Sequence, residues 1–147
     1  MKVLPSTRLM AALNTSLTAN VTGQTDIYGY FAPDSAVFPW ITMIPLASPR
    51  VLMLLNTPQF ADITVQFSVF DNSMPTTAIQ AIQGQLEGLL HANLPNVVIP
   101  SVAGEPDMHV IWSRKIGEPM IISGPKAENF FRQGVQTFQF RVQIQPG

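Results

Sequence analysis

Alternation of apolar and polar residues predicts the clearest strands of this chain. From Gln136 to Gln145 apolar residues occupy every second position from 138 onward, and the positions between them hold three glutamines and one charge, Arg141. The same period of two runs through the stretch DITVQFSVF at residues 62–70. This period predicts two strands, each with one apolar face and one polar face.

Shorter apolar stretches predict the remaining strands, which we place near 27–31 and at 40–44, 108–115 and 120–122. In the stretch FPWITMIPL both faces are apolar, and Pro39 and Pro45 restrict its ends, so we expect a central strand. In MHVIWSRK the alternation places Met108, Val110 and Trp112 on one face. The opposite face would then carry His109, Ile111 and Ser113.

Apolar residues spaced by three and four predict two amphipathic helices. The first covers about 6–17, with Ser6 as its N-cap, and its apolar face carries Leu9, Met10, Leu13 and Leu17. The second follows Pro75, and its apolar face carries Ile79, Ile82, Leu86 and Leu89. Gly84 and Gly88 lie inside this helix, which indicates either close packing on a sheet or a weak helix.

The order of these elements indicates the fold class. A helix, strands, a second helix and further strands, joined by short loops, predict an α+β fold. We expect a mostly antiparallel β-sheet with two α-helices packed on one face. The chain has 147 residues, so we expect a single α+β domain over 1–147.

Charge is sparse, which changes the expected environment of the polar faces. Asp, Glu, Lys and Arg make up 12% of the residues, against roughly 25% in a typical protein, and the net charge is -1. One interpretation is a neutral, poorly soluble monomer. We prefer the other, in which large surfaces are buried against copies of the chain or other proteins, because interface cores are depleted in charge.

The composition also excludes several classes of site. The chain has no cysteine, so it forms no disulfide, thiol nucleophile or Cys-based zinc site. No apolar run approaches the ~20 residues of a membrane span, and the N-terminus lacks the apolar core of a signal peptide. We therefore expect neither a membrane partner nor export.

Candidate catalytic and metal-binding residues are few. Glu105, Asp107 and His109 alternate and could hold a hard cation on one side of an extended segment, or simply form a solvated loop that leads into a strand. Neither His91 nor His109 has the spacing of a metal motif, and no G-x-S-x-G or phosphate loop occurs. We expect no catalytic residue, no metal and no cofactor, and hence no enzyme.

The cations and one aromatic pair are the candidates for contacts with other proteins. Arg114 and Lys115 could touch phosphates or an acidic partner, or form a solvated strand end. Arg141 could pair with an acidic residue of a neighbour or face solvent. In KAENFFRQG, Phe130 and Phe131 form either an interface anchor with a charged rim or part of the core. The full set of candidate interface residues is Arg50, Phe60, Arg114, Lys115, Lys126, Phe130, Phe131, Arg132 and Arg141.

Three linked segments carry a resemblance to a known family. They are DITVQFSVFDNSMPTTAIQAIQGQLEGLL, MHVIWSRK and FRQGVQTFQFRVQIQ. With the N-terminal helix and the FPWITMIPL strand, their order resembles that of the tail terminator, or tail completion, proteins of long-tailed bacteriophages. The resemblance covers roughly Ser6 to Gln145, and it lies in element order and texture rather than in an invariant motif.

This resemblance implies a structural role in the virion. Family members form a ring, commonly a hexamer, that caps the tail tube and stops its growth. The ring also joins the tail to the head connector, and viral double-stranded DNA passes through its lumen without sequence-specific binding. The implied partners are further copies of the chain, the tail-tube protein and connector or neck proteins. The implied location is the tail or neck of a virion that assembles in the host cytoplasm.

Two other classes remain open. The chain could be a different tail or neck subunit, such as a tail-tube or connector-completion protein. It could also be an α+β barrel that binds a small ligand or acts as an enzyme, which would require a deep pocket with converging polar groups.

Overall fold

A computed structural model of the chain describes residues 5–21, 26–30, 32–33, 35–46, 59–72, 77–90, 98–99, 108–123 and 132–144. Its helices are α1 (Pro5–Asn20) and α2 (Thr77–Leu90). Its strands are β1 (Asp26–Gly29), β2 (Trp40–Pro45), β3 (Gln59–Asp71), β4 (Val98–Ile99), β5 (Met108–Ser123) and β6 (Arg132–Ile144).

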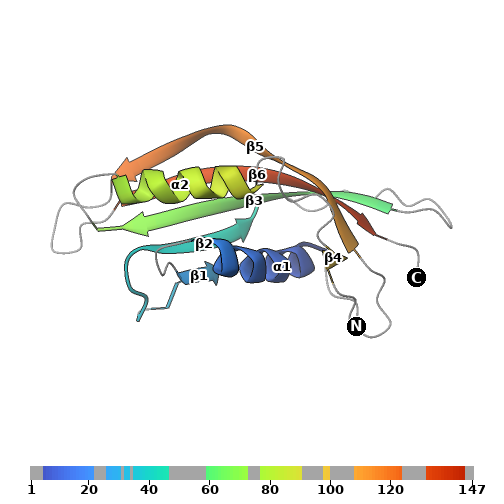
Figure 1. The fold of residues 1–147 in the computed structure, drawn as a ribbon, viewed down its shortest axis with the longest axis horizontal. Coiled ribbons are helices and arrows are strands. Elements are labelled where there is room, and N and C mark those ends of the chain that lie inside the picture. Colours follow the sequence, from blue (N-terminus) through green and yellow to red (C-terminus); the bar gives the residue numbers. More distant parts are fainter. Residues whose placement is uncertain are drawn as a thin grey trace.

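The strands form one six-stranded sheet in the order β1-β2-β3-β6-β5-β4. Among the described strands, only β1 and β2 pair in parallel, and every other pair is antiparallel. The two 13-residue strands β3 and β6 lie at its centre and pair along their whole length. Both helices lie on one face of this sheet, α1 beside β1 and β2 and α2 over β3, β6 and β5 (Figure 1). The predicted α+β fold with two helices on one face is therefore confirmed.

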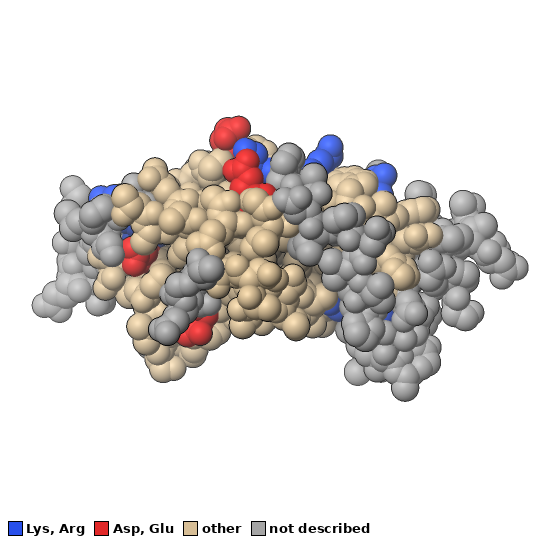
Figure 2. Space-filling model, viewed as in Figure 1, with Lys and Arg blue, Asp and Glu red and all other residues tan. Residues whose placement is uncertain are grey.

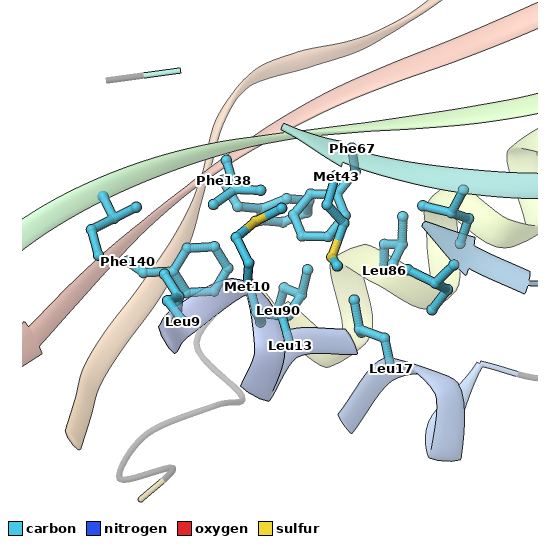
Figure 3. Close-up of a cluster of buried hydrophobic side chains, with 14 of the residues drawn as sticks. Leu9, Met10, Leu13, Leu17, Met43, Phe67, Leu86, Leu90, Phe138 and Phe140 are labelled. Carbon is cyan, nitrogen blue, oxygen red and sulfur yellow. The ribbon is translucent and has the colours of Figure 1, made fainter. Parts of the chain in front are cut away.

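A single apolar core lies between the helices and the sheet (Figure 3). The two helices contribute Leu9, Leu13, Leu17, Leu86 and Leu90, and the sheet contributes Met43, Phe67, Phe138 and Phe140. The rings of Phe67 and Phe138 meet edge to face at a centroid distance of 5.6 Å. Burial of each large apolar side chain stabilises the fold by about 1.5–3 kcal/mol. The apolar residues whose spacing predicts the strands and helices are therefore also the residues that stabilise their packing.

The structure corrects the boundaries of three predicted elements. Helix α1 already includes Pro5, so Ser6 lies in its first turn and is not its N-cap. Proline is tolerated there because the first turn has no partner for its missing N–H. Strand β3 begins at Gln59, before the predicted start at 62, and β6 begins at Arg132 rather than at Gln136.

Strand β5 differs most from the prediction. The expected strands at 108–115 and 120–122 form one continuous strand that bulges between them. Ile116 is level with Thr137 and Met120 with Val135, so four steps along β5 match two along β6. Gly117, at a φ of 69°, lies in this bulge, which accommodates the extra residues without ending the strand.

An earlier bulge in β5 makes the predicted assignment of its faces wrong. Val110 pairs with Val142 but Trp112 pairs with Arg141, so the bulge adds one residue to β5. Beyond it Trp112 lies on the face opposite to Met108 and Val110, while Ser113 is buried beneath α2. The Ser113 hydroxyl donates a hydrogen bond to the carbonyl of Leu90 at the end of α2.

The close approach of α2 to the sheet depends on a glycine of β6. A Cβ added to Gly84 or Gly88 would meet nothing within 4 Å, so these two glycines are not the reason why α2 packs closely on the sheet. A Cβ added to Gly134 would instead collide with Ile79 Cγ2 and lie 2.6 Å from Gln83 Nε2. Gly134 therefore lets α2 lie directly against the centre of the sheet.

Candidate protein-interaction surface

The face of the sheet opposite the two helices, called here the open face, is covered by no helix among the described residues. Its side chains come from the even-numbered positions of β3 and the odd-numbered positions of β6, as their pairing requires. Hydroxyl and amide groups dominate its centre: Thr42, Thr64, Gln66, Ser68, Gln133, Thr137, Gln139 and Gln143. The amide-rich alternation in the sequence thus forms one continuous polar band on this face.

Hydrogen bonds between side chains order part of this band. Ser68 is 2% exposed, and its hydroxyl oxygen accepts hydrogen bonds from Gln66 Nε2 at 3.2 Å and from Gln133 Nε2 at 3.1 Å. Because these amide and hydroxyl groups bond to one another without carrying charge, such a band can be desolvated against another protein at a smaller cost than a charged one.

One end of the open face is built around Trp112. The guanidinium carbons of Arg114 and Arg141 each lie 5.1 Å from the centroid of its ring, within the range of a cation–π contact. Arg114 donates two hydrogen bonds to Gln139 Oε1, at 3.0 and 2.8 Å. Two arginines and a tryptophan held in this way have the residue types that dominate protein interfaces.

An ion pair fixes the second of these arginines. Arg141 Nε lies 2.8 Å from Asp62 Oδ1 and Arg141 Nη2 lies 3.0 Å from Asp62 Oδ2, directly across the β3–β6 pair. The pKa of the Arg141 guanidinium is raised, chiefly by these hydrogen bonds to Asp62. Partial desolvation opposes this rise, and the negative charge of Asp62 adds to it. From the sequence, Arg141 could either pair with an acidic residue of a neighbouring subunit or face solvent. In the structure its partner is Asp62 of the same chain.

The other end of the open face carries an aromatic cluster. Phe38 stacks on Trp40 at a centroid distance of 4.3 Å, and Trp40 stacks on Phe70 at 5.6 Å. All three side chains are half-buried. Along β3, Phe70 lies eight residues from Asp62, which is roughly 27 Å in a strand. The open face thus has an aromatic patch at each end of a polar centre.

The structure divides the predicted interface residues between the two faces of the sheet. Arg114 and Arg141 lie together on the open face, and Phe60 lies on the same face, level with Gln143. Arg132, level with Asp71, and Lys115 lie on the helical face. Arg50, Lys126, Phe130 and Phe131, as well as Glu105 and Asp107 of the possible cation site, lie outside the described residues.

Lys115 belongs to an ion-pair cluster within the subunit. Its Nζ lies 3.1 Å from Glu87 Oε1 of α2 and 3.7 Å from Glu118 Oε2. The pKa of this ammonium group is raised, chiefly by its hydrogen bond to Glu87. Desolvation opposes this rise, and the charges of Glu118 and Glu87 add to it. The adjacent cations Arg114 and Lys115 therefore project from opposite faces of β5 and form no common basic patch.

Sequence reasoning missed several residues of the open face. The sequence does not single out Asp62, because its partner Arg141 is 79 residues away in the chain. Trp112 was placed on the wrong face, because a bulge leaves no clear mark in the sequence. The sequence contains one sign of the aromatic cluster. Trp40 and Phe70 each share a strand face with polar residues, which indicates aromatic side chains outside the core.

The described residues also form an open hollow on the helical face. It has a volume of about 270 Å³ and is lined by Gln80, Gln83, Gly84, Glu87, Pro119, Ile121 and Gln136. Its polar groups are mainly amides, with the one carboxylate of Glu87 already paired to Lys115.

No helix among the described residues is long and apolar enough to cross a membrane.

Comparison with known proteins finds a similarity of fold but none of sequence. No protein-family model and no curated protein matches this sequence. A chain of the solved structure titled "Virion of native gene transfer agent (GTA) particle" is similar over 94% of this chain and 90% of that chain. The TM-score is 0.57 and the sequence identity is 14%. This chain therefore shares its fold, over nearly its whole length, with a protein of a virion particle.

Proposed function

We propose that this chain is a structural subunit of a phage-like virion. The observation that carries the proposal is the fold that it shares over nearly its whole length with a chain of a gene transfer agent virion. The low charge of the chain and the aromatic and arginine patches of the open face support the same role, because they suit contact with other proteins.

Within that class, the proposed role is tail terminator. Copies of the chain assemble into a closed ring, expected to be a hexamer, that caps the tail tube, stops its growth and joins the tail to the head connector. The resemblance in element order and the absence of a catalytic motif in the sequence favour this role over an enzyme. A net charge of -1 suits a lumen through which DNA slides, because strong phosphate contacts would retard it.

A genetic experiment tests this role. Deleting the gene from the phage or phage-like element that encodes it should give tails of uncontrolled length that fail to join heads, as seen by electron microscopy. Complementation with the wild-type gene should restore tails of defined length. Tails of normal length that carry heads in the deletion strain would contradict the proposal.

A further inference from the structure

The hollow on the helical face lies between α2, the bulge of β5 and strand β6. Its walls include Pro119 and Ile121 of β5, and Gln136 is the residue of β6 that lies opposite the bulge. The volume of about 270 Å³ is just below the range of roughly 300–1,000 Å³ that is usual for pockets of drug-sized ligands. The hollow therefore has room for a smaller group, such as one residue of a peptide.

Two buried amide atoms at this hollow have no hydrogen-bond partner among the described residues. They are Gln83 Nε2 and Gln136 Oε1. Both residues line the hollow, and they are only 5% and 3% exposed. A buried polar group without a partner is costly, so native structures keep few of them. Two such atoms at one hollow point to a hydrogen-bonding group that comes from outside the subunit.

The orientation of the Gln136 amide follows from its other atom. Gln136 Nε2 donates a hydrogen bond of 3.2 Å to the backbone carbonyl of Gln83. Because a carbonyl oxygen only accepts, exchanging the nitrogen and oxygen of the Gln136 amide would place two acceptors side by side. The hollow thus offers one free acceptor, Gln136 Oε1, and one free donor, Gln83 Nε2.

Gly84 keeps the helix side of the hollow open. A glycine inside a helix is less favourable than alanine, and a Cβ added here would meet nothing within 4 Å, so packing within the subunit does not explain it. Gly84 lines the hollow, and a larger side chain at this position would take up its space. Gly88 is equally free of neighbours but does not line the hollow, which makes it a matched control.

The charges around the hollow are paired within the subunit. Figure 2 shows acidic and basic side chains side by side along the β5 edge of a face that is otherwise mostly uncharged. Glu87 is the one charged residue of the lining, and its carboxylate lies 3.1 Å from Lys115 Nζ. The other wall is apolar, with Pro119 beside an Ile121 that is 36% exposed. These features suit an uncharged group that has both amide and apolar parts.

We infer that the hollow binds one apolar residue of an extended, uncharged segment of another protein. A carbonyl of the segment accepts a hydrogen bond from Gln83 Nε2, and an N–H of the segment donates one to Gln136 Oε1. The apolar side chain of the bound residue lies against Pro119 and Ile121. A peptide main chain fits because it supplies a donor and an acceptor directly beside an apolar side chain. The site needs only the folded subunit and not a ring, so it goes beyond the proposed function.

Binding of a minimal peptide group tests the inference. The probe is N-acetyl-leucine methylamide, which carries a peptide group on each side of an apolar side chain. Saturation-transfer NMR on the purified chain should show saturable binding, with a dissociation constant on the order of 1 mM, which is usual for a ligand of this size. A matched probe has an ester oxygen in place of each amide N–H. It should bind about fivefold more weakly, because it offers no donor to Gln136 Oε1.

Three variants locate the binding site. Gly84→Leu fills the hollow and should abolish binding, whereas Gly88→Leu should leave it unchanged. Both changes replace an exposed helical glycine by a better helix former, so both variants should fold. Gln83→Met removes the donor at similar size and should weaken binding about fivefold. It should not lower the Tm, because the lost amide nitrogen has no partner among the described residues.

Several results would overturn the inference. One is a failure of the wild type to bind the probe saturably, and another is unchanged binding by Gly84→Leu. Equal binding of the amide and ester probes would remove the hydrogen bonds from the argument. A lower Tm of Gln83→Met would show that solvent already satisfies this amide. None of these results depends on assembly, so each would leave the proposed virion role untouched.

Discussion

Gly134 is the residue at which helix α2 comes closest to the sheet. An added Cβ there would collide with the stiff, buried side chain of Ile79 and with Gln83. Both neighbours would have to move within a close-packed layer, and such overpacking costs about 1–3 kcal/mol. At the residue scale, the fold depends on the absence of a side chain at this point as much as on the apolar side chains around it.

We therefore expect Gly134→Ala to lower the free energy of unfolding by about 1–3 kcal/mol. Gly84→Ala is the matched control, since its added Cβ meets nothing within 4 Å and alanine favours a helix by up to about 1 kcal/mol. Urea denaturation of the two variants and the wild type measures both changes. Equal stability of Gly134→Ala and wild type would show that α2 can shift away at no cost.

The ion pair of Asp62 and Arg141 shows what residue-level reasoning from sequence cannot reach. The alternation identified Arg141 as the only charge among amides on its strand face, but its partner depends on the register between β3 and β6. Register is a property of the paired strands, since a slip of one residue would exchange the faces. The same limit hid the contact of Trp112 with two arginines.

At the scale of elements, periodicity predicted both helices and nearly every strand within a few residues. It failed on β5, where Gly117 and Pro119 resemble a break between two strands but form a bulge inside one. The earlier bulge near Ile111 also reversed the faces of the residues that follow it. Bulges are decided by pairing with the neighbouring strand, so a single strand's sequence does not reveal them.

The reversed face has an energetic consequence for α2. Ser113 is buried and donates a hydrogen bond to the Leu90 carbonyl, one of the groups that a helix end leaves without an intrahelical partner. We expect Ser113→Ala to lower the free energy of unfolding by about 1–3 kcal/mol, because a buried acceptor loses its donor.

Thr15→Ala is the control for this prediction. It removes a comparable hydroxyl bond, from Thr15 Oγ1 to the carbonyl of Ala11, on the exposed side of α1. We expect it to change the free energy of unfolding by no more than about 0.5 kcal/mol, as is typical of surface substitutions. Equal losses in the two variants, measured by urea denaturation, would show that burial of the Leu90 carbonyl has no special cost.

At the scale of the whole molecule, the sheet has a covered face and an open face, and two unlike edges. The covered face holds the core, and the open face presents amides between two aromatic patches. Exposed large apolar side chains lie on β5, at Ile116 and Met120–Ile122, and on the β1–β2 side, at Tyr30, Val37 and Leu46. Under the proposed role, contacts with further copies and with other virion proteins would cover part of this surface.

The most direct test of this account is the mass of the purified wild-type protein in solution, read together with negative-stain images of the same sample. We expect closed rings of one size, with a mass that is a fixed multiple of 16.1 kDa and stays constant as concentration rises. Long tubes would indicate a tail-tube protein instead. A particle of 16.1 kDa at every concentration would contradict the central claim that these copies close into a ring.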